Sequence, residues 1–186
     1  MRKIILATSS PRRHEIFARA DIPFEAEDSG YEEDLSLPLP PRRLVARFAL
    51  EKARASAQRH PDAIAIGFDT VVVLEGKIFG KPKDKGEART MLAALSGRAH
   101  SILTGFAIVD GMNKKEITRV EETAVTFRGL SPSEIDAYVD SNEPMGKAGA
   151  YALQLGAARF VEKMEGDLQN GIGLPLKAVL EELKKF

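Results

Sequence analysis

The residues AIAIGFDTVVVLEG, at 63–76, constrain the fold more than any other stretch of this chain. The run is rich in β-branched residues and almost continuously apolar, which is typical of a strand buried on both faces. Within its apolar part the one acid is Asp69, and a buried carboxylate is costly unless it is paired, hydrogen-bonded or bound to a metal. The stretch that most limits the fold therefore also contains the best candidate for chemistry.

Strand and helix patterns alternate along the rest of the chain, with hairpins between some of the strands. The expected helices follow Ser10 and Ser131 and cover 42–59, 84–98 and 174–186. Further strands are expected at 3–7, 100–111, 114–129 and 158–166, hairpin turns at 75–76 and 110–113, and a Gly-rich loop at 143–154. Because hairpins interrupt the alternation, the sheet should be mixed. We predict an α/β fold, with residues 1–186 forming a single domain in which helices flank a mixed β-sheet.

The composition excludes several classes of function. Lys and Arg together number 27, as do Asp and Glu, so the charge balance gives no support for binding a nucleic acid polymer or an acidic membrane. The chain has no cysteine, which excludes disulfides, thiolate nucleophiles and Cys-ligated zinc. No apolar run approaches the length of about 18 residues that a membrane span needs, and no signal sequence is evident. We therefore expect a cytoplasmic protein without a membrane partner.

Two arginines stand where a helix begins, in the stretch ATSSPRRHEIF at 7–17. Ser10 is a good N-cap residue and Pro11 suits the first helical position, so Arg12 and Arg13 fall in the first turn. That turn carries open backbone N–H groups and the positive end of the helix dipole, so each cation there costs about 0.3–1 kcal/mol unless an anion joins it. The stretch predicts an anion site suited to phosphate, with two solvated surface arginines as the alternative.

Other charged side chains carry weaker individual signals. Glu32 and Glu33 lie in the Pro-rich, acidic loop before the second helix, and such a loop is often simply solvated. Lys52 falls on or near the apolar face of that helix. Lys81, in GKP, stands between a turn glycine and a proline, which stiffens the backbone that presents it, although an ordinary surface lysine would look the same. Asp69 itself could be the partner of a core lysine or arginine.

Motifs for other chemistries are absent from the sequence. The three histidines lack metal-ligand spacing, GxSxG does not occur, and GKIFGKP has too few residues between its glycines for a Walker loop and ends in proline. The remaining inventory of carboxylates, arginines and lysines suits Mg²⁺ and phosphate.

Nine stretches, in order, give the chain a resemblance to a known family. They are LATSSPRR, GYEED, ALEKA, GFDTVVV, GKP, LSGRAHSILTG, EETAVTF, YVDSNEPMGKAGAYALQ and GDLQNGIGLPL. Together they span nearly the whole chain and resemble the Maf family of nucleoside triphosphate pyrophosphatases. The resemblance implies an elongated α/β domain with a central nucleotide-binding cleft, often in a homodimer. It also implies metal-dependent hydrolysis of nucleoside triphosphates to a monophosphate and pyrophosphate.

The resemblance assigns roles residue by residue. It makes Asp69 the proton acceptor that activates water and Glu33 its partner in holding a divalent cation, Mg²⁺ with Mn²⁺ or Co²⁺ as alternatives. Arg12, Arg13, Lys52 and Lys81 match the family positions that surround the triphosphate and stabilise the leaving pyrophosphate. Ser10 would contribute its hydroxyl or its backbone N–H to the same phosphate site. Asp69, Lys52 and Lys81 are the expected catalytic residues.

Three positions match those that the family uses to choose the base, namely Arg12, Thr70 and Gln154. Thr70 and Gln154 resemble the branch that acts on dTTP and UTP. A glutamine amide offers both a donor and an acceptor, so it can read the imide edge of thymine or uracil. Two residues depart from the family pattern: Thr8 replaces a common serine with little expected effect, and Phe68 should alter packing rather than chemistry because it alternates to the face opposite Asp69.

Two alternatives use the same residues differently. A non-catalytic nucleotide-binding regulator of septum formation would need the cations but no water-activating acid, and a nucleotidyltransferase would need a second substrate as acceptor. The sequence leaves open whether the cell uses the protein to clean its nucleotide pool or to restrain division.

Overall fold

The computed structural model describes residues 2–186. Its strands are β1 Ile4–Ala7, β2 Glu25–Glu27, β3 Ile64–Leu74, β4 Lys77–Phe79, β5 Ala99–Asp110, β6 Lys115–Phe127 and β7 Val161–Glu165. Its helices are α1 Pro11–Ala18, α2 Pro41–Arg59, α3 Lys85–Leu95, α4 Pro132–Asp140, α5 Leu168–Ile172 and α6 Leu176–Leu183, with short 3-10 helices η1 Ala148–Ala150 and η2 Gly156–Phe160. Across the described residues, no helix is long and apolar enough to cross a membrane.

The strands form a seven-stranded sheet in the order β2-β1-β3-β5-β6-β7, with β4 paired to β3. Strand β1 runs parallel to both β2 and β3, whereas the β3–β4 and β6–β7 pairs are antiparallel. The mixed sheet and the α/β class are therefore confirmed. The β3–β4 turn is also confirmed, because Glu75 and Gly76 both have the positive φ of a tight two-residue hairpin, 50° and 78°.

The chain divides into two compact units that share the long strands. The first contains Met1–Thr70, Thr104–Glu121 and Gly173–Phe186, and the second contains Val71–Leu103 and Glu122–Ile172. The expectations of a single domain and of a central cleft stay predictions.

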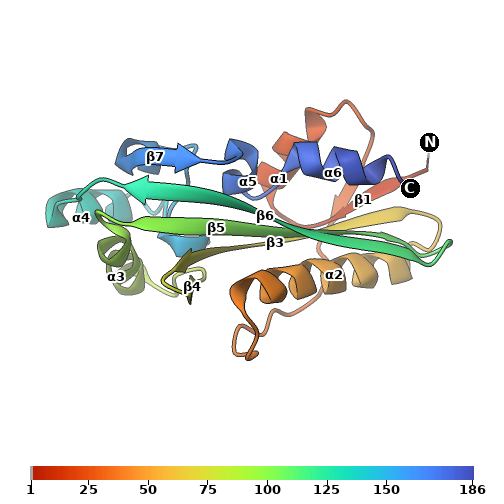
Figure 1. Ribbon diagram of the computed structural model, residues 1–186, viewed down its shortest axis with the longest axis horizontal. Helices are drawn as coiled ribbons and strands as arrows, with labels where there is room; N and C mark the ends of the chain where they lie inside the picture. The colour runs from red at the N-terminus through yellow and green to blue at the C-terminus, as the bar shows by residue number, and fades with distance from the viewer. Residues whose placement is uncertain (1) are drawn as a thin grey trace. The chain divides into compact units, whose positions relative to one another are not determined.

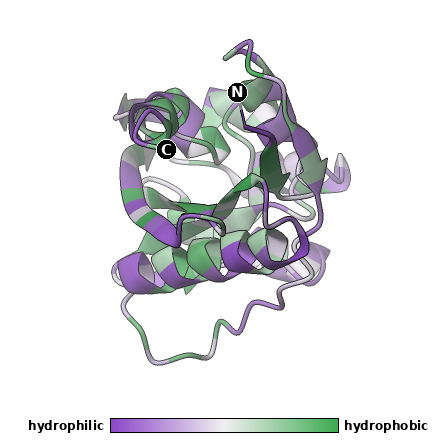
Figure 2. Cartoon of the chain, turned by 90° about the vertical axis from the view of Figure 1, so that its right-hand side faces the viewer, coloured by the Kyte–Doolittle hydropathy of each residue, from purple (hydrophilic) through white to green (hydrophobic). Residues whose placement is uncertain are grey.

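In the first unit, helix α2 lies along one face of the strands, and α1 and α6 lie on the other (Figure 1). Figure 2 shows that the strands between these helices carry mostly hydrophobic residues. One cluster between α2 and the sheet consists of small side chains, and its buried members are Ala49, Ala53, Ala57, Ala65, Ala107 and Val109. Small side chains on both elements let the helix approach the strands closely.

Gly67 makes this approach possible. A Cβ atom at Gly67 would lie only 2.1 Å from the carbonyl oxygen of Ala49 and 2.6 Å from the amide nitrogen of Ala53, so the backbone of α2 rests directly on β3. Gly105 of β5 is covered in the same way by the carbonyl of Val45, 2.4 Å from its missing Cβ. Because Gly67 and Asp69 share a face of β3, the close approach also lets Lys52, which lies between Ala49 and Ala53 on α2, reach Asp69.

The second unit has its own hydrophobic core beneath α3 and α4. It includes the buried side chains of Leu92, Phe127, Tyr138, Leu153 and Phe160. Helix α4 begins with the predicted capping box, in which Ser131 and Glu134 each accept a hydrogen bond from the backbone N–H of the other.

Three details of the second unit differ from the prediction. At the start of α3, Asp84 caps the N–H of Glu87, but the Glu87 carboxylate accepts from the N–H of Lys83, so the predicted reciprocal capping box is incomplete. Strand β7 begins at Val161, because the residues before it form η2. Helix α5, with only five residues, was not predicted; it is too short for a clear periodic pattern.

Strand β2 ties the end of α2 to the sheet through Glu27. The carboxylate of Glu27 accepts hydrogen bonds from Ser56 (2.7 Å) and Arg59 (2.6 Å) and pairs with His60 (2.8 Å). Burial by itself raises the pKa of Glu27, but these three partners outweigh it and lower the pKa from 4.5 to about 2. The stability that this group contributes is therefore fully present above about pH 4.5 and is lost as the pH falls towards 2.

We expect Glu27→Gln to lower the melting temperature at pH 6 and to make the protein lose less additional stability between pH 5 and pH 3 than the parent does. Thermal unfolding followed by circular dichroism over this pH range checks the prediction. Glu25→Gln is the matched control, because the Glu25 side chain is exposed and pairs with the exposed Lys3 on the surface. Equal acid sensitivity of the parent and of Glu27→Gln would contradict it.

Candidate active site

Lys52 lies at the centre of a charged cluster in the first unit. Its side chain comes from the face of α2 that rests on β3 and is 8% exposed. The ammonium group donates to the Asp69 carboxylate (2.8 Å), the Glu33 carboxylate (2.5 Å) and the carbonyl of Phe68 (3.2 Å). The structure thus brings together three residues that the sequence singled out, from a loop, a helix and a strand. The pairing of Asp69 with a core cation, considered above as an alternative, is present as well.

Asp69 is bound on one side only. It is 4% exposed, and while Oδ1 accepts from Lys52, Oδ2 is buried without a hydrogen-bond partner among residues 2–186. Burial raises the pKa of Asp69, Lys52 opposes this effect, and the neighbouring Glu33 carboxylate adds to it. A buried acceptor without a donor is unfavourable, so Oδ2 is suited to bind a proton donor or a cation.

Arg13 is held by the protein rather than by solvent. Its Nε donates to the carbonyl of Gly173 (2.9 Å), Nη1 donates to Thr8 Oγ1 (3.2 Å) and Phe68 O (3.3 Å), and Nη2 donates to Thr70 Oγ1 (3.0 Å). Four of the five N–H donors of the guanidinium therefore have partners in the chain. Burial lowers the pKa of Arg13, against the effect of the nearby carboxylates. The immediate role of Arg13 is to join the β1–α1 loop, β3 and the segment before α6.

Thr70 lies beside Asp69 on β3 and faces the other side of the strand. Its hydroxyl accepts from Arg13 and shares a hydrogen bond with the Thr104 hydroxyl of β5 (3.0 Å). Phe68 faces the same side, where the Arg13 guanidinium lies 5.6 Å from the centre of its ring. Phe68 therefore faces away from Asp69, as predicted, but it also supports Arg13 through a cation–π contact.

The start of α1 has the predicted position but not the predicted cap. Ser10 is the N-cap residue in an extended conformation, Pro11 is the first helical residue, and Arg12 and Arg13 follow in the first turn. The Ser10 side chain makes no capping hydrogen bond, while its own N–H donates to Thr8 Oγ1 (3.3 Å). The Ser10 hydroxyl is thus not committed to the helix that it precedes.

The other two predicted site residues belong to the second unit. Lys81 and Gln154 are both exposed there. Their segments are joined by a backbone hydrogen bond from the N–H of Gly149 to the carbonyl of Gly80, 3.0 Å long. The predicted Gly-rich loop and the GKP corner therefore form one connected part of the second unit.

The sequence reading missed three partners of the cluster, namely Thr8 as an acceptor for Arg13, Thr104 and Gly173. Gly173 is separated from Arg13 by 160 positions. It has a φ of +116°, which strongly favours glycine. The only available signal was that Thr104 and Gly173 lie in the family-like stretches LSGRAHSILTG and GDLQNGIGLPL, which had no assigned role.

A divalent cation fits the donor set of this cluster. The part of the chain that the structure describes has no group of three or more His, Cys, Asp or Glu residues suited to a metal. Mg²⁺, however, is commonly held by one or two carboxylates together with substrate phosphates. Glu33 and Asp69, with the unbonded Oδ2 of Asp69, match that simpler arrangement.

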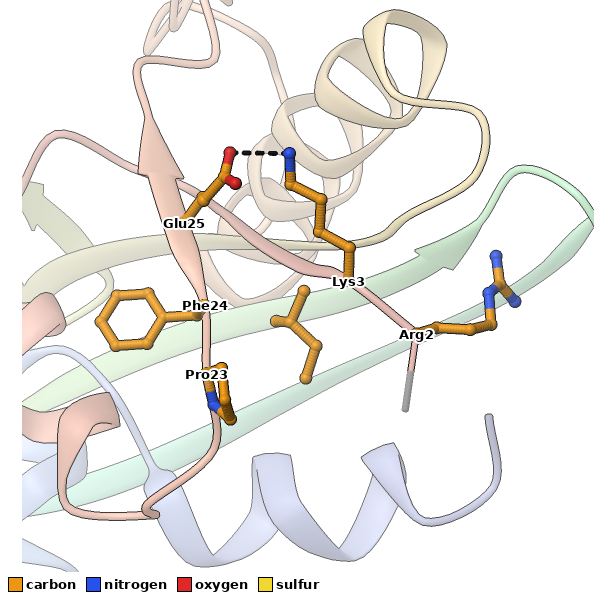
Figure 3. Close-up of a pocket in the computed structure, with 6 residues that line it drawn as sticks. Arg2, Lys3, Pro23, Phe24 and Glu25 are labelled. Carbon is orange, nitrogen blue, oxygen red and sulfur yellow. Dashed lines mark ion pairs between the residues drawn. The ribbon is translucent and has the colours of Figure 1, made fainter.

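A separate hollow at the edge of the first unit has no such chemistry. It has a volume of about 220 Å³ and is lined by Arg2, Lys3, Ile4, Pro23, Phe24 and Glu25 (Figure 3). Its most polar feature is the Lys3–Glu25 ion pair (2.7 Å), whose side chains are both largely exposed. None of the predicted site residues lines it.

Comparisons with known proteins agree over the whole chain. A family model described as Maf-like protein matches residues 3–186. The chain is 44% identical over 186 residues to the dTTP/UTP pyrophosphatase of Bacillus mycoides, covering 100% of this chain and 96% of that protein. It is 45% identical over the same length to the dTTP/UTP pyrophosphatases of Bacillus anthracis and Symbiobacterium thermophilum, covering 96% and 95% of those proteins. The similarity includes the residues of both compact units.

Proposed function

Because the chain belongs to the Maf family, we propose that it hydrolyses nucleoside triphosphates, dTTP and UTP above all, to a nucleoside monophosphate and pyrophosphate. The observation that carries the proposal is the buried Asp69, which Lys52 holds through Oδ1 while Oδ2 has no hydrogen-bond partner in residues 2–186. A non-catalytic regulator would have no use for a buried acid with an unbonded oxygen, and all three relatives are named as pyrophosphatases.

Asp69 is the proton acceptor in this proposal. The attacking water gives a proton to the Asp69 carboxylate as its oxygen approaches the α phosphate. Burial raises the pKa of Asp69, which makes the carboxylate a better base than an exposed aspartate. Lys52 keeps the carboxylate in one orientation by holding Oδ1 (2.8 Å), and its charge offsets the negative charge of Glu33 and Asp69.

The cations bind and orient the phosphate chain. Arg12 and the Ser10 hydroxyl lie at the start of α1, where the helix dipole also favours an anion. Lys81 is exposed on its stiff GKP corner and stabilises the charge on the departing pyrophosphate. Arg13 acts mainly by holding Thr8, Thr70 and Gly173 in place through hydrogen bonds. Its positive charge also adds to the attraction of the phosphate chain. Most of the acceleration then comes from positioning and electrostatics, as phosphoryl transfer requires.

The cofactor is a divalent cation, Mg²⁺ with Mn²⁺ or Co²⁺ as alternatives. Glu33 and Asp69 would hold it, and it would supply positive charge that neutralises the phosphate oxygens. Removing the metal with EDTA is expected to abolish turnover, and adding Mg²⁺ back is expected to restore it.

Base selection is proposed to rest on Arg12, Thr70 and Gln154. The exposed Gln154 amide can donate to and accept from the imide edge of thymine or uracil. The Thr70 hydroxyl is already bound to Arg13 and Thr104, so it influences selection through the position of these partners. We also propose that the enzyme works as a homodimer in the cytoplasm, where it removes non-standard nucleotides or restrains division.

The proposal predicts a specific set of products. Purified protein is incubated with Mg²⁺ and each of dTTP, UTP, CTP, GTP and ATP, and the products are separated by ion-exchange chromatography. We expect monophosphate and pyrophosphate from dTTP and UTP, with much slower conversion of the other three. Diphosphate and inorganic phosphate would show that a different bond is cleaved, and intact triphosphates throughout would support the binding-only regulator.

A further inference from the structure

The backbone on both sides of Gln154 is held by one pair of side chains. The hydroxyl of Tyr138 accepts a hydrogen bond from the N–H of Ala152, 3.2 Å away. The same hydroxyl donates to Glu143 Oε1 (2.7 Å), and Glu143 Oε2 accepts from the N–H of Gly156 (3.2 Å). The Tyr138–Glu143 pair thus accepts hydrogen bonds from the backbone two residues before Gln154 and two residues after it.

Tyr138 of this pair belongs to the buried core of the second unit. Tyr138 is 2% exposed, lies on the capped helix α4, and packs edge-on against Phe160, with ring centres 5.1 Å apart. Burial raises the pKa of Tyr138, so its hydroxyl keeps the proton that it donates to Glu143. Glu143 is fixed in turn, because the ammonium group of Lys147 donates to its carbonyl (2.5 Å).

The neighbouring residues restrict the same segment. The hydroxyl of Tyr151 pairs with His100 Nε2 (2.7 Å) in a buried contact between the loop and β5. Burial lowers the pKa of His100 to about 4, so this imidazole is neutral at pH 7. Ala152 and Leu153 are buried, whereas Gln154 is exposed. The backbone around Gln154 is therefore anchored at several points, while the side chains of Gln154 and Leu155 are exposed.

We propose that Tyr138 and Glu143 are positioning residues for base selection, which hold the 152–156 backbone so that the Gln154 amide meets the base in one orientation. The inference rests on the proposed role of Gln154. Hydrogen bonds discriminate between bases only when donor and acceptor are placed to within a fraction of an ångström, and an exposed glutamine on a free loop would lack that placement. The geometry assigns the placement to this pair.

Tyr138→Phe and Glu143→Gln test the inference. Phenylalanine keeps the packing but removes the acceptor for Ala152. Glutamine can accept from Gly156 through its one oxygen, but it then presents an NH₂ group to the Tyr138 hydroxyl and leaves that O–H without its acceptor. One lost buried hydrogen bond corresponds to roughly a 2- to 12-fold effect. We expect kcat/KM for dTTP and UTP to decrease by roughly 2- to 12-fold in each variant, mainly through a higher KM. The value of kcat/KM for GTP should change by less than about 2-fold.

Three further variants make the test decisive. Gln154→Ala measures how much selectivity the glutamine provides, and the double variant Gln154→Ala/Tyr138→Phe shows whether the tyrosine acts through it. Glu162→Gln, at an exposed position of β7, is the matched control and should leave both substrates unaffected. Circular dichroism confirms folding, and Glu143→Gln, which leaves every core side chain in place, covers the case in which Tyr138→Phe does not fold.

The outcomes separate the two proposals. Lower dTTP/GTP selectivity in both Tyr138→Phe and Glu143→Gln, with no added effect in the double variant, supports the inference. If Gln154→Ala lowers selectivity but neither Tyr138→Phe nor Glu143→Gln does, the positioning role is wrong and the glutamine's role stands. If Gln154→Ala leaves selectivity unchanged, both are wrong. An equal loss of kcat/KM for dTTP and GTP in Tyr138→Phe and Glu143→Gln would also overturn the inference, because it indicates a general loss of structure.

Discussion

Replacing Asp69 with asparagine is expected to lower turnover of dTTP by at least ~10²-fold, the scale of a general base, without unfolding the protein. The asparagine oxygen can still accept from Lys52, but the amide cannot take a proton from water. Since burial raises the pKa of Asp69, the folded state disfavours the charged form, and a neutral side chain should leave the melting temperature unchanged or higher. Steady-state kinetics and thermal unfolding of the same preparation check both parts.

Asp110→Asn is the matched control for this prediction. Asp110 is also buried, but its carboxylate accepts from Arg2 and Asn113 instead of facing the cluster around Lys52. The hydrogen bond from Arg2 holds the pKa of Asp110 well below its usual range, so the ion pair stabilises the fold. This variant should lose stability and keep its turnover, the reverse of Asp69→Asn. Near-normal turnover in Asp69→Asn would remove Asp69 from the role of proton acceptor.

Replacing Gly67 with alanine is expected to destabilise the fold by at least about 3 kcal/mol, at the upper end of the usual cost of overpacking, because the new methyl group meets backbone atoms that cannot rotate away. Its Cβ would lie 2.1 Å from the Ala49 carbonyl and 2.6 Å from the Ala53 amide. Helix α2 must therefore move off β3, and Lys52 moves with it, away from Asp69. We expect a melting temperature lower by roughly 6–12 °C and a loss of turnover in the fraction that stays folded.

Gly129→Ala is the control for the substitution itself. A Cβ at Gly129 would have nothing within 4 Å. Alanine should therefore be neutral or slightly stabilising there, because it restricts the unfolded chain. A melting temperature of Gly67→Ala within about 2 °C of the parent would contradict the direct contact between α2 and β3, since that shift corresponds to less than about 1 kcal/mol.

Hydrophobic patterns predicted most of the larger elements. The β-branched run at 63–76 became β3, the helix formers at 42–59 became α2, and the Ser131/Glu134 signal became the capped start of α4. These signals are local, because the spacing of apolar residues over a few positions decides which face of a helix or strand they share. Strand β2 and helix α5 have few residues and weak patterns, and for that reason only the tertiary structure revealed them.

The members of the charged cluster were predicted, and the pairing of Asp69 with a core cation was one of the alternatives, but the particular partners were not predicted. Asp69 stood out as an acid in an apolar run, and Lys52 as a lysine on an apolar face. That Lys52 would bind both Asp69 and Glu33 depends on how closely α2 approaches β3, which Gly67 allows. A glycine inside a strand pattern signals a close approach but does not say of which element.

The sequence by itself determined which side chains are available for chemistry and on which elements they stand, because periodicity, caps and turn residues act over a few neighbouring positions. Only the tertiary structure decided that Arg13 binds Thr70, 57 positions away, and Gly173, 160 positions away, and that a tyrosine and a glutamate grip the backbone around Gln154. Such partners meet only after strands pair and helices pack. Hydrogen bonds of this kind therefore depend on the whole arrangement of each unit and leave no local pattern in the chain.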